Sequence, residues 1–183
     1  MSKKDAALDP LSPEDWQGYV GDLQKETQRG AAIVGGALLD DLLLQLIASY
    51  LVDDKLALKE LLVNPYSPLS TFASRIAAAY SLGLITRVER HDLKLIEDIR
   101  NEFAHRRPGR AFATDPVATL VAQLQAPDLL PDSLRRAFAK EPRQVFINVV
   151  SMLATFLDTR RRTAPSRLVP PRPIVLLEAD RAA

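Results

Sequence analysis

The side chains best suited to chemistry in this 183-residue sequence lie between Glu97 and His105. If this segment is helical, at about 100° per residue, Arg100, Asn101 and His105 share one polar stripe with Glu97. Arg100 could then hold a phosphate group, and His105 could act as a general acid or base. In the structural alternative, Arg100 and Asn101 fasten neighbouring loops and His105 finishes the helix.

The rest of the composition limits the chemistry that such a stripe could do. The chain has no cysteine and two histidines, which excludes disulfides, thiolate metal sites and histidine-rich metal sites. Gly30, Gly35 and Gly36 do not have the spacing of a nucleotide-binding loop, and no Gly-x-Ser-x-Gly motif occurs. We therefore expect no metal and no cofactor, and a reaction at the stripe would use one imidazole per chain.

The positive charge is concentrated in two windows. The chain has 24 basic and 23 acidic residues, but outside residues 100–110 and 158–172 fifteen basic residues face twenty-one acidic ones, a net charge of −6. We take the arginines of these windows that lie outside the stripe and upstream of the tail as candidates for binding nucleic acid or a protein partner: Arg106, Arg107, Arg110, Arg160, Arg161 and Arg162. In the structural alternative, they are solvated helix ends whose charge suits the helix dipole.

Helix signals dominate the body of the chain. Apolar periodicity, caps and breakers predict helices over about 12–28, 31–52, 54–62, 69–82, 86–104, 116–125, 133–139 and 142–162. The sequence therefore predicts an all-α, single-domain bundle of about six to eight helices over residues 12–162. We expect a flexible N-terminus over 1–11 and an extended, proline-rich tail over 163–183, with residues 174–177 as the one strand candidate.

The most apolar predicted helix, 31–52, also carries two aspartates and a glutamine, so we interpret it as a buried helix and not a membrane span. Asp40 falls on its apolar face, where an unpaired carboxylate would be costly. Either Asp40 pairs with an arginine such as Arg75 or Arg100, or it lies at a seam open to water. We expect Gly35–Gly36 to permit close helix packing.

The segment from about residue 30 to 116 resembles the mannitol repressor family of bacterial all-α proteins. The resemblance rests on four stretches in order: Ser67-Pro68-Leu69-Ser70-Thr71-Phe72, Ala79-Tyr80-Ser81-Leu82-Gly83-Leu84-Ile85, Ile99-Arg100-Asn101-Glu102-Phe103-Ala104-His105 and Ala111-Phe112-Ala113-Thr114-Asp115. It implies a cytoplasmic protein of transcriptional control that supplies no catalytic residues. We expect a homo-oligomer, a dimer, that binds a protein or nucleic-acid partner and no membrane.

A second resemblance suggests another function. The stretch from Arg100 to His105 is similar to the Arg-Asn-x-x-x-His signature of HEPN-type domains, helical proteins that include many dimeric ribonucleases and toxins. It implies that Arg100 stabilises a phosphate, that Asn101 orients it and that His105 transfers the proton, with two protomers meeting at a dimer axis. The alternative to a non-enzymatic regulator is therefore a metal-independent endoribonuclease.

Overall fold

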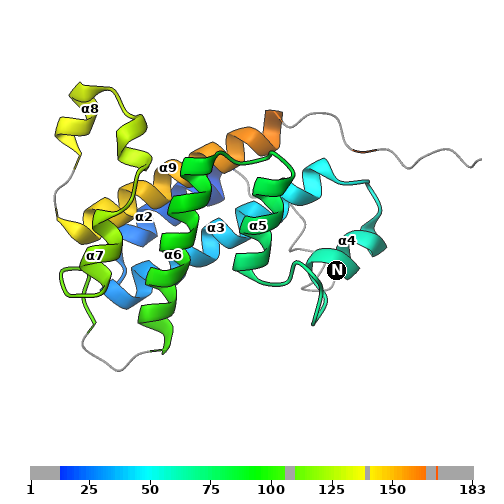
Figure 1. Ribbon diagram of the computed structural model, residues 1–183, viewed down its shortest axis with the longest axis horizontal. Helices are drawn as coiled ribbons and strands as arrows, with labels where there is room; N and C mark the ends of the chain where they lie inside the picture. Colours follow the sequence, from blue (N-terminus) through cyan, green and yellow to red (C-terminus); the bar gives the residue numbers. More distant parts are fainter. Residues whose placement is uncertain (1–12, 106–109, 139–140, 164–167, 169–183) are drawn as a thin grey trace, which may run out of the picture.

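The computed structural model describes residues 13–105, 110–138, 141–163 and 168 (Figure 1). This part of the chain contains eight α-helices, one 3-10 helix and no strand, so the predicted all-α bundle is confirmed. The elements are α2 (Pro13–Lys25), α3 (Gln28–Tyr50), α4 (Lys55–Leu62), α5 (Phe72–Ser81), α6 (Arg87–His105), α7 (Val117–Ala122), η1 (Ala126–Leu129), α8 (Asp132–Ala137) and α9 (Pro142–Thr163). The predictions for 1–11 and for the strand at 174–177 fall outside the described residues, as does nearly all of the predicted tail.

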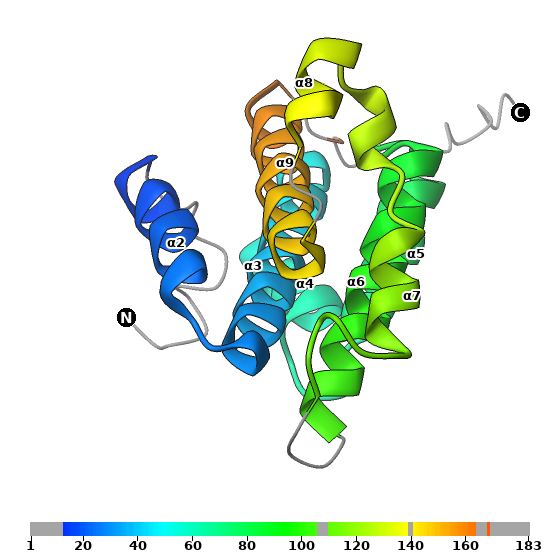
Figure 2. The same cartoon turned by 90° about the vertical axis from the view of Figure 1, so that its left-hand side faces the viewer.

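Helix α3 occupies the centre of the bundle. It runs beside α9 along the long axis of the molecule, and α5 and α6 cross the pair (Figure 1). Turned by 90°, the helices form three layers: α2, then α3 with α9, then α5, α6 and α7 (Figure 2). Because α3 has neighbours in all three layers, nearly every one of its faces is apolar.

The surroundings of α3 account for its composition. By length and apolar composition α3 could cross a membrane, but 72% of its most apolar stretch is buried inside the molecule. Leu39, Leu43 and Ile47 have no exposed surface. The structure thus places α3 as a core helix, as predicted.

Two adjacent glycines let helices approach α3 on two sides. A Cβ at Gly35 would lie 3.3 Å from Phe146 Cε1 of α9, and a Cβ at Gly36 would lie 2.8 Å from Arg100 Cδ of α6. A side chain at either position would force its neighbour to shift. The predicted role of Gly35–Gly36 in close packing is confirmed.

The helix ends follow local signals read from the sequence. Thr86 and Glu89 have the spacing of a capping box and form a reciprocal pair at the start of α6: Thr86 N donates to Glu89 Oε2 at 2.6 Å, and Glu89 N donates to Thr86 Oγ1 at 3.2 Å. Helix α5 ends just before Gly83, whose φ of 71° is the left-handed conformation that glycine adopts without strain.

The predicted helix over 116–125 is a partial error. Helix α7 ends at Ala122, and the chain continues into η1. The carboxylate of Asp92, on α6, accepts the N–H of Gln125 at 2.9 Å and that of Ala126 at 2.7 Å. A side chain from another helix thus binds the first N–H groups of the new turn, and Pro127, which lacks an N–H, also prevents α7 from continuing.

Phe112 anchors the loop between α6 and α7. Its ring is fully buried, 4.9 Å from the rings of both Phe103 and Phe146 between centroids. Its backbone N–H donates to Gln28 Oε1 at 2.8 Å. The loop is thus fixed to α3, α6 and α9 together.

Gly35→Leu should destabilise the bundle, since the added side chain must enter the space held by Phe146 and Val150. We expect a loss of about 2–3 kcal/mol in the free energy of unfolding, measured by urea denaturation. Gly18→Ala is the matched control, because nothing lies within 4 Å of a Cβ there. It should gain up to about 1 kcal/mol from helix propensity. Equal effects of the two substitutions would contradict the packing described.

Candidate functional site

The polar stripe of α6 lies along its junction with α3. The aliphatic part of Arg100 crosses α3 at Gly36, Asn101 is partly buried, and His105 is exposed at the helix end. Among the described residues, none of these three side chains forms a hydrogen bond or an ion pair. Five residues apart on a helix, Arg100 and His105 point about 140° away from each other. Within one chain they mark opposite edges of the stripe and do not converge.

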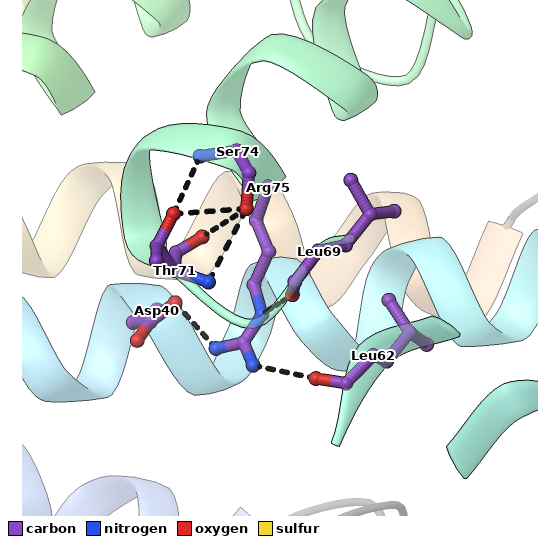
Figure 3. Close-up of polar contacts among 6 residues, drawn as sticks. All are labelled: Asp40, Leu62, Leu69, Thr71, Ser74 and Arg75. Carbon is purple, nitrogen blue, oxygen red and sulfur yellow. Dashed lines mark hydrogen bonds and ion pairs between the residues drawn. The ribbon is translucent and has the colours of Figure 1, made fainter. Parts of the chain in front are cut away.

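A buried ion pair lies beside this stripe. Arg75 Nη1, on α5, donates to Asp40 Oδ1, on α3, at 2.6 Å (Figure 3). The Arg75 side chain is 8% exposed and that of Asp40 is 24% exposed. Of the two arginines that the sequence offered as partners for Asp40, Arg75 forms the bond and Arg100 acts on it through space.

Arg75 also holds the connection between α4 and α5. Its Nε donates to the carbonyl of Leu69 at 2.9 Å, and its Nη2 donates to the carbonyl of Leu62 at 2.9 Å (Figure 3). Between these two carbonyls the loop turns at Tyr66, which has a φ of 64° and is fully exposed. One guanidinium thus joins three segments: α3, the end of α4 and the loop before α5.

Burial and nearby charges shift the pKa values of two carboxyl groups near the contact between α3 and α6, those of Asp40 and Glu97. Burial raises the pKa of Asp40, and Arg75 and Arg100 oppose the increase. Burial also raises the pKa of Glu97, with a further increase from Asp98 and a decrease from Arg100. Arg100 therefore acts through space on carboxylates of both α3 and α6.

The predicted arginine cluster after α6 is only partly described. Arg106 and Arg107 lie outside the described residues. Arg110 Nη1 donates to the carbonyl of Asp115 at 2.6 Å, and its Nη2 lies 3.3 Å from Glu102 Oε2. The Arg110 side chain therefore closes the loop that Phe112 anchors.

The second cluster forms the last turn of α9, where all three of its candidate arginines are paired. Arg160 Nη2 donates to Glu89 Oε1 at 3.0 Å, and Arg161 and Arg162 each lie 2.7 Å from an oxygen of Asp158. Burial alone would raise the pKa of Asp158, but the hydrogen bonds from its two arginines outweigh burial and lower it. These contacts fit the helix-end alternative for Arg160, Arg161 and Arg162.

Two important carboxylates, Glu89 and Asp92, were not singled out as buried groups from the sequence. Glu89 is 1% exposed and Asp92 has no exposed surface. The signal was present for Asp92, because it shares a helical face with Ile96 and Ile99. In the part of the chain that the structure describes, no group of three or more His, Asp or Glu side chains could hold a metal ion.

The comparisons give one structural relative. No family model matches the sequence, and no curated protein matches it either. The chain is similar to one in the X-ray structure of the MtlR–HPr complex from Escherichia coli, with a TM-score of 0.63 and 22% identity. The match covers 78% of this chain and 98% of the other. The mannitol repressor-like fold is supported, and the HEPN resemblance finds no support in these comparisons.

Arg75→Met should destabilise the protein strongly, since it leaves the Asp40 carboxylate and two carbonyls without their donor. We expect a loss of about 3–5 kcal/mol in the free energy of unfolding. Arg135→Met is the matched control, since this half-exposed arginine bonds Asp132 at the surface, and it should cost no more than about 0.5 kcal/mol. In a double-mutant cycle, Asp40→Leu with Arg75→Met should cost less than the sum of the single changes. An additive result would show that the pair is uncoupled.

The buried carboxyl of Asp92 gives a pH-dependent prediction. Burial raises its pKa above 3.8, and the N–H groups of Gln125 and Ala126 oppose this only in part. The folded state thus binds the proton more readily than the unfolded chain, so this group's contribution to stability falls as pH rises through the raised pKa. Relative to Asp92→Asn, the wild type should gain stability as pH is lowered from about 7 to about 4, in chemical denaturation. A constant difference, or a loss, would contradict the assignment.

Proposed function

We propose that this protein is a non-enzymatic regulatory protein that acts by binding a protein partner. The observation that carries the proposal is the similarity of fold to a chain of the MtlR–HPr complex, which covers 98% of that chain. Because the two sequences are 22% identical, this similarity shows a shared fold and no more. The partner is inferred from the protein–protein complex in which that fold occurs.

The geometry of the candidate site supports a role without chemistry. The guanidinium of Arg75 is buried and donates to Asp40 and two carbonyls, so it holds the scaffold together. Arg100 and His105 point to opposite edges of the α6 stripe. A single chain therefore offers no assembled pair of phosphate-binding and proton-transferring groups.

The finer parts of the proposal follow the resemblance to mannitol repressors. We place the protein in the cytoplasm, as a homodimer, in the transcriptional control of sugar-alcohol uptake. Since Arg160, Arg161 and Arg162 are paired with carboxylates, a protein partner is favoured over direct contact between this cluster and nucleic acid.

Titration with HPr from Escherichia coli tests the proposed function directly. Isothermal titration calorimetry should give a saturable heat with a dissociation constant of about 1–100 μM, the range of transient complexes. An unrelated protein of similar size, such as ubiquitin, is the control and should give none. Equal heats for HPr and the control, or no heat with HPr, would contradict an HPr-type partner.

Incubation with RNA in EDTA separates the regulator from the ribonuclease. The purified protein should leave the RNA intact, and His105→Ala should change nothing, because the proposed role needs no proton transfer. Cleavage that disappears in a folded His105→Ala variant would overturn the non-enzymatic proposal. It would favour the HEPN-like alternative.

A further inference from the structure

The exposed face of α6 begins with three basic residues: Arg87, Arg90 and Lys94. At spacings of three and four residues they lie on one side of the helix, within about 11 Å along its axis. Arg87 and Lys94 are exposed, and Arg90 is partly buried. We call these three residues the basic face of α6.

The basic residues of this face, unlike the arginines described above at the end of α9, are not bound to carboxylates or carbonyls of described residues. The arginines at the end of α9, like Arg75 and Arg110, are bound to carboxylates or carbonyls. None of the three side chains of the basic face forms a hydrogen bond or an ion pair with a described residue. Their charge is therefore available to a partner.

Arg90 is also held in a fixed orientation. Its Cζ lies 4.5 Å from the ring centroid of Tyr80, on α5, and its Nε is buried without a hydrogen-bond partner. A guanidinium held against a ring keeps its terminal nitrogens free for a carboxylate and loses little entropy on binding. Tyr80 is 37% exposed and Leu82, at the turn into α6, is 38% exposed, so apolar contacts adjoin the charge.

The basic face is short, and this favours a protein over a nucleic acid as its ligand. One turn beyond Lys94 the same helix carries Glu97 and Asp98. A phosphate backbone that followed α6 would meet these carboxylates, and three cations contact few phosphates. A short acidic segment with apolar side chains matches both the charge and the exposed apolar side chains of Tyr80 and Leu82 beside it.

We propose that the basic face of α6, with Tyr80, docks an acidic segment of a protein partner. The inference rests on the proposed function only in that a partner-binding regulator needs such a surface. Carboxylates of the segment pair with Arg87 and Lys94, and one more binds Arg90 through its free terminal nitrogens. Tyr80 and Leu82 cover the apolar side chains between those carboxylates.

Fluorescence anisotropy with a labelled deca-glutamate peptide tests this surface without HPr, so its failure is distinguishable from failure of the proposed function. The peptide should bind, and binding should weaken as ionic strength rises. Arg87→Glu with Lys94→Glu should weaken it at least about tenfold. Lys25→Glu with Lys55→Glu, which changes the net charge equally on α2 and α4, should have little effect. Thermal unfolding of both variants checks that they remain folded.

Two further arms complete the test. Tyr80→Leu removes the ring under Arg90 and should weaken the peptide by a smaller factor while leaving the cations in place. A single-stranded deoxyoligonucleotide of the same length should bind more weakly than the peptide. No binding of the peptide, equal losses in the two double variants, an unchanged affinity in Tyr80→Leu, or tighter binding of the oligonucleotide would each overturn the proposal.

Discussion

The whole structure depends on covering the apolar surface of α3, of whose most apolar stretch 72% is buried. Exposing the apolar surface of this 23-residue helix to water would be unfavourable. Helices α2, α5, α6 and α9 all pack against it. Gly35 and Gly36 let two of these neighbours come close. The layers of the bundle, with α3 and α9 in the middle one, follow from this requirement (Figure 2).

The same requirement explains the ion pair between Asp40 and Arg75. A carboxylate on α3 must be balanced once α5 and α6 cover it, and Arg75 provides the charge together with three hydrogen bonds. Arg100 adds a second positive charge from α6 and reaches α3 because Gly36 leaves room for its side chain. Of the residues that resemble a reactive site in sequence, Arg100 thus packs across α3, while the basic face that we propose for a partner lies elsewhere on α6.

Much of the fold could be predicted from local patterns, because caps, glycines and apolar periodicity act within a few residues. The spacing of Thr86 and Glu89 marks the start of α6. For Asp40 the sequence leaves two alternatives, an arginine such as Arg75 or Arg100 and a seam open to water, and the structure shows the bond to Arg75. Pro127 marks a break after α7 in the sequence, but the bonds from Asp92 on another helix to Gln125 and Ala126 could not be predicted.

The candidate site was predictable only in part. The stripe from Arg100 to His105 was visible as a spacing, but its relation to Gly36 depends on how α3 and α6 pack. The basic face is not visible as a cluster in the sequence, because its three residues are spaced three and four apart and gather only along one face of a helix. The pairing of Arg160 with Glu89 joins positions 71 residues apart, which no local pattern reveals.

Native-state hydrogen exchange tests the central claim, that α3 organises a single rigid scaffold. Amides of α3 around Leu39, Leu43 and Ile47 should exchange only through global unfolding, with the highest protection in the chain. Amides of α8, whose Leu134 is 56% exposed, should exchange through smaller openings. If the α3 amides exchanged at a lower free energy than those of α9 or α6, α3 would not be the organising helix, and the account would be wrong.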